Sequence, residues 1–312
     1  MKSAMQRRLK RIGIWLAISC ALLAALLVIV PYATTGTSLD SSRDSNSPSV
    51  EPAQQKRDNI DTNLTVMTVN IAHGRGTSLH QALLAANTVR SNLDAIAKLL
   101  AGQRPEVVAL QEADGPSLWS GGFNHVDYLG EASGLSHQFR GEHVKGWKTS
   151  YGTALLSQGP LHDCSSVAFA PSPPTLSKGY VVCRVHWPGN PGIDVTVVSV
   201  HLDFSRSSVR DAQVDNMIDK LSDQDGPLII MGDFNCSWTK NEKSALRTLA
   251  EGLEVRAYEP AAENMGTFPR SGRRLDWILI SAEMEFVDYE TMPDLISDHR
   301  AVIATLKLRP GQ

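Results

Sequence analysis

The chain has 312 residues, and 42% of them are hydrophobic, which is enough for one globular core plus an additional segment. The formal net charge is −3, but the first 33 residues hold five basic side chains and no acidic one. The remainder therefore has 25 basic against 33 acidic residues, a net charge of −8. Proteins that grip long nucleic acid normally show a basic excess, so this composition disfavours that function.

The N-terminal segment has a basic flank and then an apolar run. The stretch "MKSAMQRRLKR" is followed by uncharged, mostly apolar sequence from Ile12 to about Ala33, and such a run of about 21 residues can cross a bilayer as a helix. The basic flank predicts a cytoplasmic N-terminus, with the rest of the chain periplasmic or extracellular. A cleaved signal peptide, which would release a secreted protein, is the alternative. The length of the run and the lack of a clear A-x-A site favour an uncleaved anchor over residues 1–33.

Residues 34–63 contain almost nothing to bury and are predicted as a disordered tether. The catalytic domain then occupies residues 64–312 and is expected to be a monomer.

Two similar units are predicted at the start and in the middle of this domain. Each has two strands that bracket an amphipathic helix, with apolar residues on one helix face. The strands are Leu64–Ile71 and Glu106–Glu112 around a helix at 89–103, and Ile193–Leu202 and Gly226–Asp233 around a helix at 208–223. A helix near Lys243–Leu253 follows, and then strands at 275–281, 284–290 and 299–308. This order predicts an α/β fold.

The two units also end alike. The first strand reaches Asn70 in one unit and His201 in the other, and the second strand reaches Glu112 and Asp233. This similarity predicts an internal duplication that brings the ends of four strands to one edge. Open α/β sheets place their sites at such strand ends.

Further polar residues join this set. Asn235 follows Asp233 in "LIIMGDFNCSW", and Asp276, Asp298 and His299 lie near the C-terminus. Alone, the Asp-Asn pair would be read as a turn. Together, carboxylates and amides without a cysteine ligand favour Mg²⁺, or Mn²⁺, over zinc. The set suits hydrolysis of a phosphate ester, with a positioned base that takes a proton from water.

These segments resemble the motifs of the endonuclease/exonuclease/phosphatase superfamily, the DNase I-like fold that includes DNase I, AP endonucleases, inositol-polyphosphate 5-phosphatases and bacterial sphingomyelinases. In family order they are "MTVNIAHGRG", "VVALQEAD", "VVSVHLD", "IIMGDFN" and "SDHRAV". The resemblance covers the chain from Leu64 to Leu308. It implies a four-layer α/β/β/α sandwich, in which two mixed β-sheets carry helices on the outside.

The resemblance also implies roles for the first four motifs. Glu112 would be the principal metal ligand, and Asn70 would lie near the metal and the phosphate. His201 would bind phosphate or act as an acid. Asp233 would position the nucleophilic water, and Asn235 would steady the phosphate.

The last motif implies further roles. His299 would be a general base or a phosphate ligand, Asp276 its acidic partner, and Asp298 a residue that orients His299 or supports the metal. Ala72 stands where AP endonucleases carry an acid, and those enzymes lack a histidine at the position of His201. The chain is therefore nearer to the DNase I, sphingomyelinase and phosphatase branches.

Three features stay open at this level. Cys164 and Cys183 could form a disulfide outside the cytoplasm, but their separation in space decides this. The "HGRG" stretch could cradle phosphate or form a plain surface loop, and Lys178 could select the part of the substrate that is not cleaved.

The resulting hypothesis is a membrane-anchored, Mg²⁺-dependent phosphoesterase. The anchor and the charge of −8 favour a lipid headgroup or another small phosphate ester as its substrate. An extracytoplasmic nuclease and a catalytically inactive, tethered binding module are the alternatives.

Overall fold

The structure, a computed structural model, describes residues 62–80, 84–146, 148–238 and 244–310. The predicted anchor at 1–33 and nearly all of the predicted tether at 34–63 lie outside these ranges. Among the described residues, no helix is long and apolar enough to cross a membrane.

The described chain is an α/β fold with two mixed β-sheets. In the first sheet the strand order is β12 (Met284–Thr291), β13 (Val302–Leu308), β1 (Leu64–Asn70), β2 (Val107–Asp114), β5 (Thr149–Ser157) and β3 (His137–Arg140), with β4 (Val144–Gly146) paired to β5. In the second the order is β10 (Arg256–Ala257), β11 (Asp276–Ile280), β9 (Leu228–Asp233), β8 (Asn190–His201), β7 (Gly179–Trp187) and β6 (His162–Ala168).

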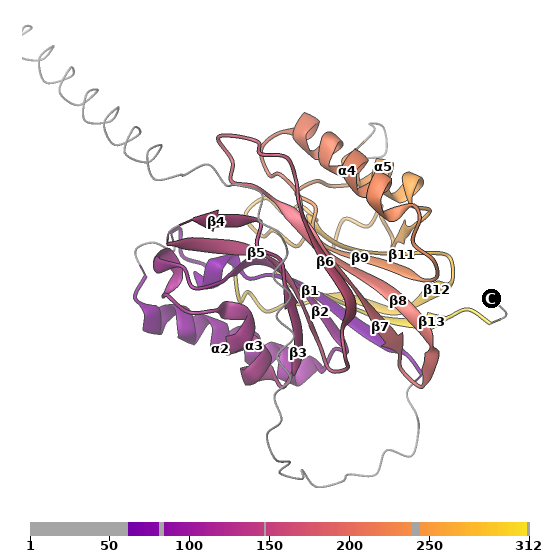
Figure 1. The fold of residues 1–312 in the computed structure, drawn as a ribbon, viewed down its shortest axis with the longest axis horizontal. Helices are drawn as coiled ribbons and strands as arrows, with labels where there is room; N and C mark the ends of the chain where they lie inside the picture. Colours follow the sequence, from indigo (N-terminus) through magenta and orange to yellow (C-terminus); the bar gives the residue numbers. More distant parts are fainter. Residues whose placement is uncertain (1–61, 81–83, 147, 239–243, 311–312) are drawn as a thin grey trace, which may run out of the picture. The chain divides into compact units, whose positions relative to one another are not determined.

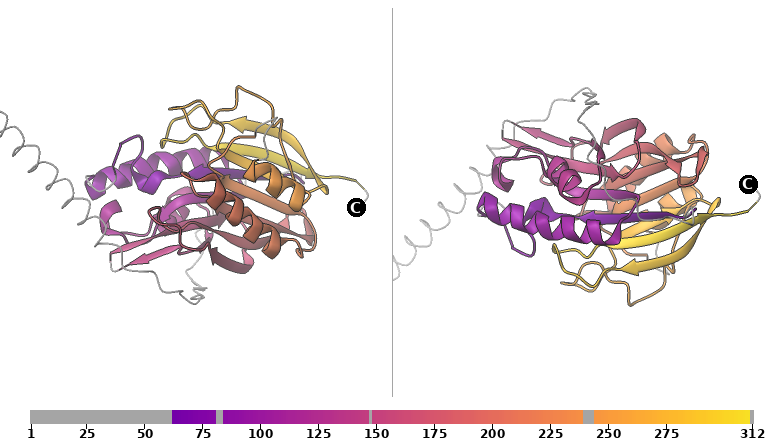
Figure 2. Two further views of the ribbon diagram at one scale, coloured as in Figure 1. Left: turned by 90° about the horizontal axis from the view of Figure 1, so that it is seen from above. Right: turned by 90° about the horizontal axis from the view of Figure 1, so that it is seen from below.

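Helices cover one face of each sheet (Figures 1 and 2). Buried residues of α2 (Ala86–Gln103) and α3 (His125–Ser133) share a hydrophobic cluster with the first sheet. Buried residues of α4 (Ser207–Leu221) and α5 (Ala245–Gly252) share another with the second sheet. A third cluster contains residues of both sheets, so their other faces pack against each other.

The sequence builds these layers through strands that are apolar on both faces. In β1, Val66 belongs to the cluster between the sheets, whereas Met67 and Val69 belong to the cluster under the helices. Successive side chains of a strand point to opposite faces, so a nearly continuous apolar run fits a strand that is covered on both sides.

Both predicted strand–helix–strand units are present, one in each sheet. β1 pairs in parallel with β2 after the crossover through α2, and β8 pairs in parallel with β9 after the crossover through α4. Most predicted boundaries agree within a few residues. The last strand is shorter than predicted, because β13 begins at Val302 and leaves His299 in the preceding loop.

The open question about the two cysteines is answered by a disulfide. Cys164 of β6 and Cys183 of β7 are bonded, with their Cα atoms 4.1 Å apart. The bond links the edge strand of the second sheet, β6, to its antiparallel neighbour β7.

Candidate active site

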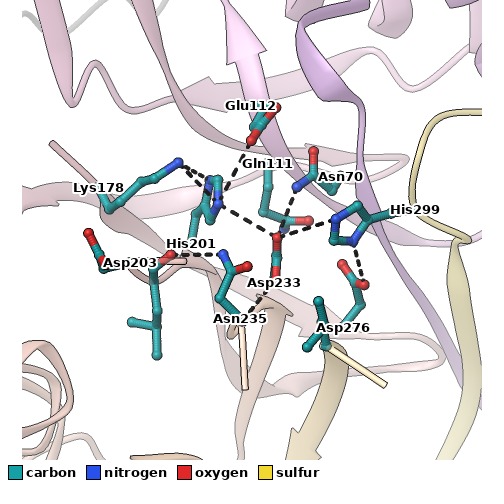
Figure 3. A network of polar contacts seen from close by, with 12 residues as sticks. Asn70, Gln111, Glu112, Lys178, His201, Asp203, Asp233, Asn235, Asp276 and His299 are labelled. Carbon is teal, nitrogen blue, oxygen red and sulfur yellow. Dashed lines mark hydrogen bonds and ion pairs between the residues drawn. The ribbon is translucent and has the colours of Figure 1, made fainter. Parts of the chain in front are cut away.

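Four of the predicted site residues lie at the ends of parallel strands. Asn70 ends β1, and His201 and Asp233 are paired in register at the ends of β8 and β9. Glu112 lies near the end of β2, next to Gln111, the register partner of Asn70. Because the two sheets pack face to face, these ends meet (Figure 3).

Asp233 is the centre of this group. Its carboxylate accepts a hydrogen bond from Asn70 Nδ2 at 3.0 Å. His201 Nε2 and His299 Nε2 lie 3.6 and 3.9 Å from the same oxygen, Oδ2. Burial raises the pKa of Asp233 to about 7. The charge of His299 lowers this pKa, and the charge of Asp276 raises it. A carboxyl group with this pKa can exchange a proton near neutral pH.

The backbone around Asp233 is fixed by close packing. A Cβ atom on Gly232 would lie 2.0 Å from the Val200 carbonyl oxygen, and the φ of 152° there favours glycine. Asn235 has φ 53°, and its N–H donates to Asp233 Oδ1 at 2.9 Å. Asn235 Nδ2 donates to the Leu202 carbonyl at 3.0 Å, and an amide nitrogen of this kind carries two hydrogens.

His299 is held by Asp276. Its Nδ1 lies 2.8 Å from Asp276 Oδ2, and both side chains are buried. Burial alone lowers the pKa of His299, but the carboxylates of Asp276 and Asp233 outweigh it and raise the pKa to about 10. The structure therefore favours a cationic His299 at neutral pH, which can donate to a phosphate oxygen.

Glu112 is turned into the site by irregular backbone. It has φ 53° and lies where the register between β2 and β5 shifts, a β-bulge that re-aims its side chain. Its Oε2 is 3.3 Å from His73 Nε2, and His73 Nδ1 is 2.6 Å from Asp114 Oδ1. Burial by itself raises the pKa of Glu112, but the charges of His73 and Lys178 hold it below its ordinary value.

Lys178 belongs to the site itself. It is buried, and its Nζ lies 3.2 Å from His201 Nε2 (Figure 3). Burial lowers the pKa of Lys178, although the carboxylates of Glu112 and Asp233 raise it. Burial, followed by the charge of Lys178, holds the pKa of His201 well below its ordinary value, so that ring is neutral.

Asp298 pairs with Arg75 and not with the ring of His299. Its Oδ2 lies 2.6 Å from Arg75 Nη2 in the "HGRG" stretch. The carboxylate that bonds to the His299 ring comes instead from Asp276.

The donor set fits a hard divalent cation. The carboxylates of Asp233 and Asp276 each offer an oxygen, and these ligand atoms lie within 4.8 Å of each other. Asp276 Oδ1 is buried and has no hydrogen-bond partner among the described residues, which is costly unless another group binds it. Glu112 adds a further carboxylate, whose Oε1 lies 4.0 Å from His201 Nε2. Carboxylate and carbonyl oxygens are the ligands that Mg²⁺ and Mn²⁺ prefer.

A family model agrees with this arrangement. The model described as the endonuclease/exonuclease/phosphatase family matches residues 67–299, which span the site from β1 to His299. The chain belongs to this family. The family places it among hydrolases that act on phosphate esters.

Several solved structures share the fold of this chain. The endonuclease/exonuclease/phosphatase from Beutenbergia cavernae is 20% identical, covers 79% of this chain and 72% of its own, and has a TM-score of 0.63. The protein of the same description from Bacteroides vulgatus is 17% identical, with 79% and 99% covered and a TM-score of 0.62. The human Nocturnin catalytic domain is also 17% identical, with 80% and 95% covered and a TM-score of 0.58. The chain matches no curated protein.

Two buried residues of the site, His73 and Asp114, are not predicted from the sequence. His73 and Gly74 of "HGRG" are buried, so the stretch is no plain surface loop. Asp114 is buried too, and the pair it forms with His73 resembles that of Asp276 and His299. Position could have found Asp114, since it ends β2 two residues after Glu112.

Proposed function

We propose that the chain is a membrane-anchored, extracytoplasmic phosphoesterase that depends on Mg²⁺, or Mn²⁺, and hydrolyses a phosphodiester or phosphomonoester by attack of water. The observation that carries the proposal is the convergence of Asn70, His201 and His299 on the Asp233 carboxylate, beside Glu112. These groups come from segments up to 229 positions apart in the sequence, and a shared catalytic centre explains why they meet.

Glu112 and Asn70 are the proposed metal ligands, with Asp298 as a third group that supports the metal site. The Asp233 and Asp276 carboxylates are the nearest further oxygens, and they lie in the group that could share one ion. A divalent cation bound there would polarise a phosphoryl oxygen and offset charge that develops in the transition state.

Protein side chains supply the proton transfer and the rest of the charge stabilisation. Asp233, with a pKa near neutral, aligns the attacking water and accepts its proton. His299 and Lys178 supply positive charge to the non-bridging oxygens. The side-chain amide of Asn235, which carries a second hydrogen besides the one bonded to Leu202, donates to the same oxygens.

The proposed substrate class is a lipid headgroup or another small phosphate ester. The net charge of −8 after residue 33 opposes binding to a long polyanion. The predicted anchor at residues 1–33 would hold the enzyme next to lipid.

The anchor has its own test, because a cleaved segment and a retained one differ in mass. Intact-mass measurement of the mature protein should find residues 1–33 still attached, in a fraction that pellets with membranes after a high-salt wash. A soluble mature chain that begins after Ala33 would refute the anchor and leave the hydrolase proposal standing.

The catalytic proposal is tested with the full chain in detergent and Mg²⁺, against sphingomyelin, phosphoinositides, bis-p-nitrophenyl phosphate and plasmid DNA. Glu112→Gln should abolish turnover, whereas the matched control Glu131→Gln changes an exposed residue of α3 and should have no effect. Released headgroup supports the proposal. Nicked plasmid alone would replace it with a nuclease, and silence across the panel would leave a tethered binding module.

A further inference from the structure

A second group of metal-binding side chains lies on the second sheet. His162 of β6, His186 of β7 and Asp194 of β8 each offer a ligand atom within 4.8 Å of the others. His186 Nδ1 is 2.6 Å and His162 Nε2 is 3.4 Å from the same oxygen, Asp194 Oδ1. The two rings are neighbours, with centroids 4.8 Å apart. Three strands thus contribute one ligand each.

A β-bulge brings His162 into this group. The register runs from His162↔Arg184 to Ser165↔Val182, so β6 has one residue more than β7 over this interval. The extra residue is accommodated at Asp163, which has φ 50°, a left-handed conformation that is unfavourable for a residue with a side chain. Without the bulge, strict alternation from Ser165 would place His162 on the opposite face of the sheet.

The group lies on the same face of the sheet as α4 and α5. In β7 the even-numbered Tyr180 and Val182 belong to the cluster under these helices, and His186 follows in the same alternation. His186 is paired in register with Asp194. His162 and Asp194 are half-buried and His186 is exposed, so ions can reach the group from solvent.

The group is distant from the hydrolytic centre. Asp194 and His201 are seven positions apart on β8, which corresponds to about 23 Å at the rise of an extended strand. The residues near Asp233 therefore cannot bind the same ion.

We propose that His162, His186 and Asp194 bind one Zn²⁺, with water as a fourth ligand. Two imidazole nitrogens and one carboxylate oxygen are a typical ligand set for zinc and less suited to Mg²⁺, which prefers oxygen. Each neutral imidazole has one nitrogen without a proton, and a tautomer shift can present that nitrogen at His186 Nδ1 and His162 Nε2.

Neighbouring groups orient the ligands. Arg184 Nη2 lies 3.7 Å from Asp194 Oδ2, which leaves Oδ1 turned to the two rings. The Cys164–Cys183 disulfide holds β6 against β7 beside the bulge. A bound ion would link the edge strand β6 to β7 and β8, so its expected effect is on stability.

The test is zinc stoichiometry of the full chain without a histidine tag, measured by equilibrium dialysis in excess Mg²⁺ that occupies the hydrolytic centre. The wild type should retain one Zn²⁺ that His162→Gln and His186→Gln each lose, with affinity at least about tenfold weaker. His80→Gln, a change of an exposed histidine outside the group, is the matched control and should retain the ion. Equal zinc content in wild type and both variants would overturn the proposal.

Two further readouts separate loss of the ion from loss of the fold. Zn²⁺ should raise the melting temperature of the wild type and of His80→Gln, but not of either cluster variant, while circular dichroism shows all of them folded. X-ray absorption at the zinc edge should show two imidazoles bound to the ion of the wild type. A spectrum without imidazole would mean that the three side chains form only a hydrogen-bonded group.

Discussion

Replacing Asp276 with asparagine should lower the pKa of His299 and move the pH dependence of hydrolysis. The pKa of His299 rises from its ordinary 6.5 to about 10, and Asp276 is the largest of the groups that raise it. An opposite charge this close typically shifts a pKa by 1–3 units, so Asp276→Asn should lower the pKa by about that amount. This corresponds to about 1.4–4 kcal/mol of interaction with the charged ring.

The direction of the effect on activity follows from the proposed role. If protonated His299 donates to the phosphate, activity is present below its pKa and falls as the pH rises through it. The alkaline limb of kcat/KM should therefore lie near pH 10 in the wild type and 1–3 units lower in the variant. The same sign holds for stability: the contribution of the His299–Asp276 pair is fully present below pH 6.5 and is lost as the pH rises through about 10.

Two assays measure this prediction: NMR titration of the His299 ring in metal-free protein, and pH–rate profiles with Mg²⁺. Asp288→Asn removes an exposed carboxylate of β12 and is the matched control. A pKa of His299 that is the same in Asp276→Asn and in the wild type would refute the reasoning, whatever happens to the rate.

Three further predictions concern the backbone beside Asp233, the disulfide of the second sheet and the charge of Lys178. Gly232→Ala places a Cβ 2.0 Å from the Val200 carbonyl and should lower the free energy of unfolding by about 1–3 kcal/mol or more, seen as a lower melting temperature; unchanged melting would contradict it. Cys164→Ser with Cys183→Ser opens a disulfide between residues 19 positions apart and should cost about 3 kcal/mol, measured by denaturant unfolding; equal midpoints in oxidised and reduced wild type would contradict it. Lys178→Met should reduce kcat/KM by about tenfold to a hundredfold through a lost charged hydrogen-bond donor, and full activity would exclude Lys178 from substrate binding.

Much of the fold is predictable because it depends on hydrophobic periodicity and on the polar residues that end each apolar run. Apolar runs such as that of β9 end at a polar residue, and the helices between strands carry one apolar face, so both parallel units follow from local sequence. The strand ends then identify Asn70, Glu112, His201 and Asp233, and the structure brings these four together.

The remainder depends on backbone features that local sequence does not encode. Glu112 reaches the site through a bulge with φ 53°, and His73 has φ 53° in a turn that buries its ring. The partner of His299 is Asp276 on another strand, although Asp298 is its neighbour in sequence. The sequence offers Lys178 only as a group that could select part of the substrate, and the structure adds its position directly before β7, beside His201.

The central claim is that one divalent ion binds where these strand ends meet. Anomalous diffraction from crystals soaked in Mn²⁺ locates that ion directly. The account predicts a peak within bonding distance of a Glu112 carboxylate oxygen, on the side that faces Asp233, and loss of that peak in Glu112→Gln. A strong peak elsewhere, with none beside Glu112, would contradict it.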